Sequence, residues 1–417
     1  MLIASLNTPH TSSPLQSLHA LDWLNFFLAA LLTGFGPFLA VYLAERGWAA
    51  ADVGFVLTVG GLAGLLTQVP AGELIDMAQS KRAIVGTGIG AVAFGLLVLG
   101  LRSDFPSVFA AAVIQGMAGS VVGPGIAAIS LGLVGHGGLA ERLGRNQRFA
   151  SMGGLTAAAM MGLTGYLVST RAIFFESATL LLPLLVAMIR IHAADIHYGR
   201  SCGASDSHTK PTPRASRIVL FKDHRLLTFA ACIFLFQLAN ASILPLLGER
   251  LVHAEGRWSS LVVSALILVP QIIVAALAPQ VGRTADSWGR RPLLLIGFGV
   301  VPVRSALFAV TVDPTLVVAI QVLDGISGAT LGVLTTLVIA DLTKGTGRFN
   351  LAQSVVGTLS AVGASLSTSM SGLVVDRFGD MVGLVSVTST GLIAVAILLL
   401  FMPETRPLAP RPTFGIS

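Results

Sequence analysis

Long apolar runs, nearly free of charged side chains, recur along most of the sequence and constrain the fold more than any other feature. A transmembrane helix needs ~20 mainly apolar residues to cross a hydrocarbon core of ~30 Å. Because lipid offers backbone amides no hydrogen-bond partner, such runs are expected to be helical. Charged residues make up only 11% of the 417 residues, whereas a soluble domain carries roughly 25%. The sequence therefore predicts an all-α membrane protein.

Charged and turn residues separate twelve such runs, in two groups of six. The first group covers residues 24–44, 50–72, 83–101, 106–134, 149–169 and 172–191. The second group covers residues 226–248, 259–282, 292–312, 314–340, 350–375 and 379–402. We therefore expect a tail (1–21), a six-helix bundle (22–191), a linker (192–225), a second six-helix bundle (226–402) and a tail (403–417). The linker is rich in Lys and Arg, and we interpret it as solvated.

The basic residues predict the orientation of these spans. If the N-terminus is cytoplasmic, 19 of the 26 Lys and Arg residues fall on the cytoplasmic side, and only Arg304 lies inside a span. Cytoplasmic loops of membrane proteins carry such an excess of Lys and Arg. We therefore expect a bacterial inner-membrane protein with both termini in the cytoplasm. The net charge of +6 then reports orientation, and we expect no nucleic-acid partner.

Three pairs of positions in the two groups of spans share nearly one offset. Gly72-x-x-x-Asp76 and Gly282-x-x-x-Asp286 lie 210 residues apart, and Pro37 and Pro245 lie 208 apart. Gln115-Gly116 and Asp324-Gly325 lie 209 apart. A constant offset over three helix pairs indicates an internal duplication. Parallel six-helix repeats place a substrate site near the midplane, between halves that rock against each other.

These residues resemble the major facilitator superfamily along essentially the whole chain. Gly282 to Arg291 reads Gly-x-x-x-Asp-x-x-Gly-Arg-Arg, which is similar to the signature loop of that family in its second-half copy. The first-half copy keeps Gly72 and Asp76 but has Met77, Gln79 and Ser80 where the family has a basic residue, Gly and a basic residue. Gln115-Gly116-x-x-Gly119 resembles a second family motif, with Ala112 in place of a frequent Arg. Pro403-Glu404-Thr405-Arg406 resembles the exit of the last helix.

The resemblance implies a fold of twelve helices in two pseudo-symmetric bundles and transport by alternating access. It also implies that the first, fourth, seventh and tenth spans line the substrate path. Each polar residue there has a simpler interpretation, an interhelical hydrogen bond. The candidates for the substrate cavity are Asn25, Thr33, Gln115, Gln237, Asn240 and Thr330.

The two loop motifs are candidates for a gate. Glycine allows two helices to approach closely, and an Asp with a following Arg can bond to exposed helix ends across a junction. The candidate gating residues are Gly72, Asp76, Gly282, Asp286 and Arg290. For Arg290, a purely topological role as a loop charge is an equal alternative.

Asp324 and Arg304 are ionisable groups deep inside the expected tenth and ninth spans, where charge is costly. They lie ~14 Å and ~12 Å from the outer ends of their spans, taking a rise of ~1.5 Å per residue, so an ion pair is expected. We expect Asp324 to carry the coupling proton and Arg304 to tune it. The alternative is a permanent structural pair. Asp22 ranks below Asp324, because a solvated carboxylate costs little at the edge of a span.

The absence of several catalytic and nucleotide-binding motifs argues against two classes of protein. The sequence has no Gly-x-Ser-x-Gly, His-Glu-x-x-His or Gly-x-x-x-x-Gly-Lys-Ser/Thr, which disfavours a hydrolase and an ATP-driven pump. We expect no enzyme activity, cofactor or metal, and a monomer whose partners are the lipid bilayer, a small-molecule substrate and protons. Few charges in the expected cavity favour proton-coupled export of a small, partly apolar molecule. The alternatives are proton-linked import of a metabolite or metal chelate, and a membrane sensor that keeps the fold.

Overall fold

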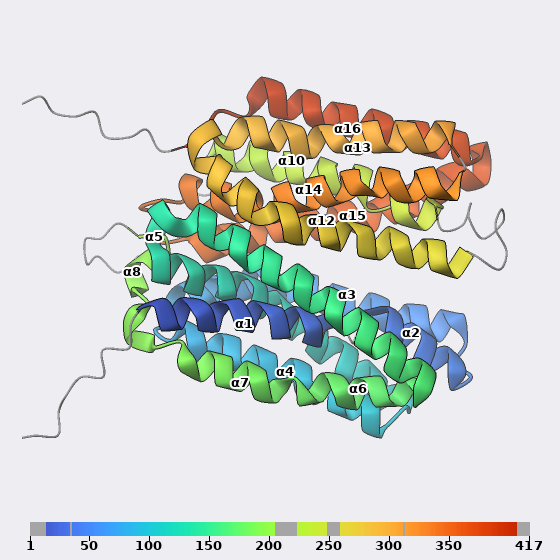
Figure 1. Ribbon diagram of the computed structural model, residues 1–417, viewed down its shortest axis with the longest axis horizontal. Coiled ribbons are helices and arrows are strands. Elements are labelled where there is room, and N and C mark those ends of the chain that lie inside the picture. Colours follow the sequence, from blue (N-terminus) through green and yellow to red (C-terminus); the bar gives the residue numbers. More distant parts are fainter. Residues whose placement is uncertain (1–13, 34–35, 205–222, 248–258, 312, 407–417) are drawn as a thin grey trace, which may run out of the picture.

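The computed structural model describes residues 14–33, 36–204, 223–247, 259–311 and 313–406, which form helices and short connections with no β-strand among them. Figure 1 shows long helices running side by side in two groups. The N-terminal half comprises α1 (Pro14–Thr33), α2 (Gly36–Glu45), α3 (Ala50–Met77), α4 (Lys81–Leu101), α5 (Phe105–Leu167), α6 (Thr170–Thr179) and α7 (Leu181–Arg190). The C-terminal half comprises α10 (His224–Asn240), α12 (Ser259–Trp288), α13 (Arg290–Val310), α14 (Pro314–Leu342), α15 (Phe349–Phe378) and α16 (Asp380–Phe401). Between the halves lie η1 (Ala193–Asp195) and α8 (Tyr198–Ser201).

The described residues contain 11 helices long and apolar enough to cross a membrane, which confirms the predicted helical membrane fold. The count differs from twelve because the expected spans 106–134 and 149–169 both fall in α5, which consists of two helices joined at a kink and counts once. At ~1.5 Å per residue a straight helix of its 63 residues would be about 95 Å long, three times a hydrocarbon core. The count of twelve stays a prediction.

A kink at Gly135 divides α5 into two arms. Gly135 has φ 66° and ψ −176°, a backbone conformation that favours glycine. The side-chain amide of Asn146 donates a hydrogen bond of 2.8 Å to the hydroxyl of Ser130. In a straight helix these residues would be about 24 Å apart. The chain therefore folds back at Gly135, and the two arms lie side by side.

Parts of the expected tail and of the expected linker are packed against helices. Helix α1 begins at Pro14 within the expected tail, and Ser17 and Leu21 are buried; proline is well suited to the first helical turn. Ser201 and Cys202, in the expected linker, are also buried. Both segments pack because their small or apolar side chains fit against neighbouring helices, a property that the local composition does not show.

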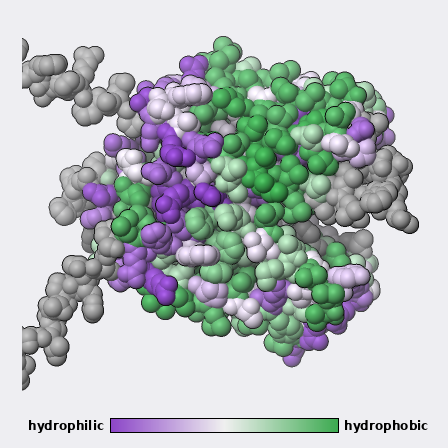
Figure 2. All heavy atoms as spheres, in the orientation of Figure 1, coloured by the Kyte–Doolittle hydropathy of each residue, from purple (hydrophilic) through white to green (hydrophobic). Residues whose placement is uncertain are grey.

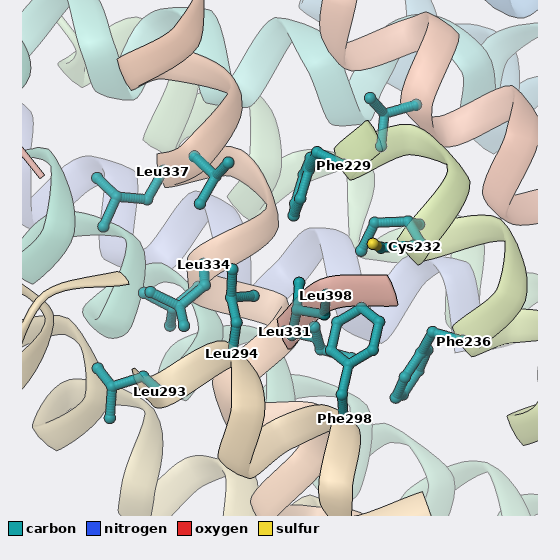
Figure 3. Close-up of a cluster of buried hydrophobic side chains, with 14 of the residues drawn as sticks. Phe229, Cys232, Phe236, Leu293, Leu294, Phe298, Leu331, Leu334, Leu337 and Leu398 are labelled. Atoms are coloured by element: carbon teal, nitrogen blue, oxygen red, sulfur yellow. The ribbon is translucent and has the colours of Figure 1, made fainter. Parts of the chain in front are cut away.

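Two large clusters of buried apolar residues form the core. One cluster of buried residues is built from the N-terminal half, and the larger cluster joins α10 and α12 to α16 with the region around the α5 kink. Figure 3 shows the larger cluster, in which Phe236 of α10 and Phe298 of α13 pack with ring centroids 5.0 Å apart. Without a hydrophobic driving force in lipid, this close packing is what holds such helices together.

The end of the molecule at which the segment between the halves lies is called the linker end. It contains the turns α3–α4, α12–α13 and α14–α15, the kink of α5, η1 and α8, and it lies at the left in Figure 1. Figure 2 shows hydrophilic residues gathered at this end, whereas hydrophobic residues cover the middle of the C-terminal half.

Candidate functional site

A buried polar cluster joins three helices of the C-terminal half. Arg304 of α13 forms an ion pair with Asp324 of α14. The Arg304 guanidinium also donates to the side-chain oxygens of Asn240 of α10, at 2.7 Å, and Gln321 of α14, at 3.4 Å. The Arg304 side chain is 3% exposed and the Asp324 side chain 31%. The expected pair therefore forms, and its carboxylate is the accessible member.

Asp324 shares a helix face with residues that line a cavity. Leu331 and Thr335 lie 7 and 11 positions further along α14, which at 3.6 residues per turn places all three within about 20° of one direction. Leu331 and Thr335 both line a cavity of about 140 Å³ between α10, α14 and α15. Asp324 lies about 10 Å from Leu331 along this face, away from the linker end.

The walls of this cavity are mixed and uncharged. Its polar lining comes from Gln237, Thr335, Gln353 and Ser360, and the remaining lining is apolar apart from Gly357. Gln237 donates to the Ser360 hydroxyl at 3.1 Å, and Gln353 donates to the Thr336 hydroxyl at 3.0 Å. The side-chain oxygen of Gln353 is buried and has no hydrogen-bond partner in the described part of the chain. The cavity is thus lined by amide and hydroxyl groups and by apolar side chains, which suits a small uncharged molecule.

The other expected cavity residues make local contacts. Asn25 and Thr33 donate to carbonyls one turn earlier in α1, those of Leu21 and Ala29. Gln115 is buried near Gly95 of α4, and Thr330 packs against Gly297 of α13. Gln237 lines the cavity, and Asn240 binds Arg304. Gln353 and Ser360 were missed, because no expectation included the eleventh span among the lining helices. Thr335 lies in the tenth span, which was expected to line the path, but was not among the candidates.

Asp22 is not at a solvated edge. It is 1% exposed and forms ion pairs with Arg142 and Arg145 of α5. Arg142 donates further to the side-chain oxygen of Asn146 at 2.7 Å. The expectation of a cheap solvated carboxylate is wrong, because the second arm of α5 brings two guanidinium groups to α1.

At the linker end, Asp76 of α3 bonds across the two halves. One carboxylate oxygen accepts from the backbone and the side-chain amide of Asn350, at 3.1 and 2.8 Å, and the other accepts from the backbone of Leu351 at 2.9 Å. These donors belong to the first turn of α15, where free N–H groups and the helix dipole favour an anion. Asp76 is 1% exposed. Its carboxylate therefore caps a helix of the opposite half.

Gly72 makes the approach of α3 to α15 possible. A Cβ atom on Gly72 would lie 2.4 Å from the Ser354 hydroxyl and 2.5 Å from the carbonyl oxygen of Asn350. Any larger side chain would push the two helices apart.

The segment after α7 closes over the same junction. The hydroxyl of Tyr198 and the thiol of Cys202 donate to the carbonyl of Asp76 at 3.1 and 3.2 Å, and Lys81 donates to the Cys202 sulfur at 3.3 Å. The carbonyl of Cys202 accepts from the backbone of Phe349 at 3.0 Å. Burial raises the pKa of the Cys202 thiol and of the Tyr198 hydroxyl. Tyr198 and Cys202 of the linker thus connect the two halves through hydrogen bonds of neutral groups.

The second copy of the motif makes a different set of contacts. A Cβ on Gly282 of α12 would lie 2.4 Å from the carbonyl oxygen of Ala140 in α5, so this glycine also allows the halves to approach. Asp286, however, is paired with Arg290, four residues further on, at 3.0 Å, and its side chain is 49% exposed. Arg290 also binds Asp341 at the end of α14, at 2.9 Å. The charged residues of this copy bond within the C-terminal half.

Glu404 completes that junction. Its carboxylate accepts from the backbone of Arg290 at 2.8 Å and of Arg291 at 3.0 Å, at the start of α13. Burial acts to raise the pKa of Glu404, but these backbone hydrogen bonds outweigh it and leave the pKa below its usual value.

In the residues that the structure covers, no group of three or more His, Cys, Asp or Glu is placed to hold a metal ion.

Comparison with known proteins adds three matches. Residues 18–382 match the model of the MFS_1 like family. Two uncharacterized MFS-type transporters of Mycobacterium tuberculosis, from strains CDC 1551 / Oshkosh and ATCC 25618 / H37Rv, are each 34% identical over 408 residues, covering 96% of this chain and 98% of theirs. A crystal structure of a mutant of the nucleoside transporter NupG is similar in fold, with a TM-score of 0.64 and 18% identity over 93% of this chain and 99% of that one.

Proposed function

The chain belongs to the MFS_1 like family of MFS-type transporters, and from this premise we propose that it is a proton-coupled exporter of a small, partly apolar, uncharged molecule. It works by alternating access in the bacterial inner membrane, as a monomer with both termini in the cytoplasm. The observation that carries the proposal is the Arg304–Asp324 ion pair, whose carboxylate lies on the same face of α14 as the cavity lining.

Asp324 is suited to carry the proton because it is more exposed than its partner Arg304. Its carboxylate is partly accessible, whereas the Arg304 guanidinium is buried and held by Asn240 and Gln321. Protonation of Asp324 removes the charge that balances Arg304 inside the membrane, where an unbalanced charge is costly. Binding or release of the proton therefore changes the free energy of the contact between α10, α13 and α14. Such a bias is what couples a proton to a conformational equilibrium.

The cavity supports the substrate class. Its lining contains no charged residue, and Arg304, which would attract an anion, is buried away from it at 3% exposure. Apolar walls with a few placed polar groups are typical of sites for small organic molecules. We propose that the linker end acts as the gate, which Asp76 and the close contacts at Gly72 and Gly282 hold closed.

Import of an uncharged metabolite is the second candidate. The side-chain amides of Gln237 and Gln353 in the cavity lining favour a solute with its own hydrogen-bond donors and acceptors. The solved protein of similar fold is described as a nucleoside transporter, and a nucleoside has such groups. The third candidate is a sensor that binds a ligand without moving it.

A substrate screen in cells separates the directions. Cells with and without the protein are compared for uptake and for resistance, at two external pH values. Export predicts resistance and lower accumulation that depend on the proton gradient. Gradient-dependent accumulation would instead establish import, and binding without flux would establish the sensor.

The role of Asp324 is tested in proteoliposomes with an imposed pH gradient. Asp324→Asn is expected to abolish gradient-driven flux, whereas the matched control Asp52→Asn, at an exposed position at the start of α3, is expected to leave it unchanged. The neutral double variant Arg304→Gln/Asp324→Asn distinguishes a proton carrier from a structural pair. A structural pair predicts recovery of coupled flux in the double variant, and that recovery would contradict our assignment.

A further inference from the structure

A second and larger cavity lies on the outside of the N-terminal half, in the groove between α1 and α7. Its volume is about 790 Å³. None of its lining residues belongs to the cavity between α10, α14 and α15. The groove is therefore not part of the proposed transport site.

The polar groups of the groove lie at one end, and the rest of its lining is apolar. Gln16, His19 and Arg190 line it at the linker end, beside Leu15, because α1 begins and α7 ends there. Trp23, Phe27 and Val186 line it further along the two helices. Gln16 and Phe27 are 11 residues apart in one helix, which corresponds to about 16 Å. This order follows the order of groups in a phospholipid, whose headgroup lies at the surface and whose acyl chains lie deeper.

The charge of the groove is positive. Its titratable lining residues are His19 and Arg190, and none of its lining residues is acidic. The neighbouring carboxylates are bound elsewhere: Asp22 pairs with Arg142 and Arg145, and Asp195 accepts from the Ser17 hydroxyl at 2.6 Å. Arg190 and His19 are exposed. The charge at the mouth of the groove thus complements an anionic headgroup.

Trp23 strengthens this assignment. It is 51% exposed and packs on Phe27 with ring centroids 5.7 Å apart. An exposed tryptophan between a basic mouth and an apolar floor is typical of the boundary between headgroups and acyl chains.

We propose that the groove between α1 and α7 binds an anionic phospholipid from the leaflet at the linker end. Arg190 and His19 contact the phosphate, and an acyl chain lies along Trp23, Phe27 and Val186. Charge and apolar area act together, as they do wherever proteins bind anionic membranes stably. The bound lipid fixes α1 against α7, the first and last spans of the N-terminal half.

Native mass spectrometry of the full chain in detergent tests the proposal, with phosphatidylglycerol and phosphatidylcholine titrated separately. The wild-type protein is expected to retain phosphatidylglycerol more tightly. Arg190→Gln is expected to weaken its binding about five-fold, as for one basic residue at a membrane surface. Val186→Trp, which fills the groove without changing charge, is expected to weaken both lipids. Arg377→Gln, at an exposed position at the far end of α15, is the control and is expected to change neither.

Three results would overturn the proposal. Equal retention of the two lipids by the wild-type protein would remove the charge selectivity. An unchanged affinity in both Arg190→Gln and Val186→Trp would place the lipid elsewhere. A preference for phosphatidylglycerol that appears only after deletion of residues 1–13 would show that the N-terminal segment occupies the groove. Melting temperatures of each variant without lipid identify any that fail to fold, and the Val186 and Arg190 variants then substitute for each other.

Discussion

The two copies of the loop motif, at α3–α4 and at α12–α13, differ in the direction of their charged contacts. The copy that keeps fewer family residues, around Asp76, bonds across the halves to the first turn of α15. The copy that keeps the whole pattern, around Asp286 and Arg290, bonds within its own half. Both glycines make the close approach between halves. The comparison shows that glycine is the shared element of the contact between the halves, whereas the carboxylate bonds across the halves in one copy.

The largest expected difference is between Asp76→Ala and Asp286→Ala. Removing Asp76 leaves two buried backbone N–H groups without a charged acceptor, a loss of about 3 kcal/mol or more, which shifts the closed-to-open ratio at the linker end roughly 150-fold or more. Removing Asp286 deletes an ion pair whose carboxylate is 49% exposed, worth about 1 kcal/mol at most, and Arg290 keeps its pair with Asp341. Double electron–electron resonance between spin labels at Gln79 and Lys344, exposed on opposite halves, measures this opening.

The wild-type protein with the same labels is the control for that experiment. If Asp286→Ala opened the linker end as far as Asp76→Ala, the asymmetry described here would be wrong. In that case both copies would bond across the halves during transport.

Gly72→Ala and Gly282→Ala are both expected to open the linker end, to a similar extent and less than Asp76→Ala. In each, the new Cβ meets a carbonyl oxygen of the other half, at 2.5 Å for Gly72 and 2.4 Å for Gly282, and overpacking of this kind costs about 1–3 kcal/mol. Both variants should favour the open linker end, by roughly 5- to 150-fold. Gly86→Ala is the control, because a Cβ there meets nothing within 4 Å. An effect of only one glycine variant would confine the close approach to one junction.

The smallest expected effect is the pH dependence of the α12–α13 junction through Glu404. Because its folded pKa is lowered, Glu404 contributes stability that is fully present above its unfolded pKa of about 4.3 and is lost as pH falls through the folded value. A carboxylate at a helix N-terminus contributes about 0.3–1 kcal/mol. Glu404→Gln should therefore lower the melting temperature slightly at pH 7 and less at pH 4. The control is Glu141→Gln, exposed on α5, and an equal loss at both pH values would exclude the charge as the cause.

Several sequence predictions depend only on local composition, and these are confirmed. The apolar runs predict membrane-spanning helices, and the motifs around Gly72 and Gly282 predict the family. The ion pair between Arg304 and Asp324 was predictable because two isolated charges at similar depth in adjacent spans have few other partners. The roles of Asp324 and of the gating residues stay predictions.

Other features depended on which helices meet. The bend at Gly135 brings Arg142 and Arg145 to Asp22, so a carboxylate at the apparent edge of a span is buried in an ion-pair network. The cavity is lined partly by α15, which places Gln353 and Ser360 beside Gln237. Neither contact has a signal in the spacing of the residues.

The sequence by itself determined that this protein lies in a lipid bilayer and is helical, because hydrocarbon requires helices of a fixed apolar length and excludes most charges. The repeated motifs also predicted its two similar halves. Only the tertiary structure decided which polar groups become partners. Asp76 and Asn350 are 274 positions apart in the chain, and their bond exists because α3 and α15 pack closely at Gly72. Hydrophobic length is a property of a single segment, whereas a hydrogen bond requires two segments at one place.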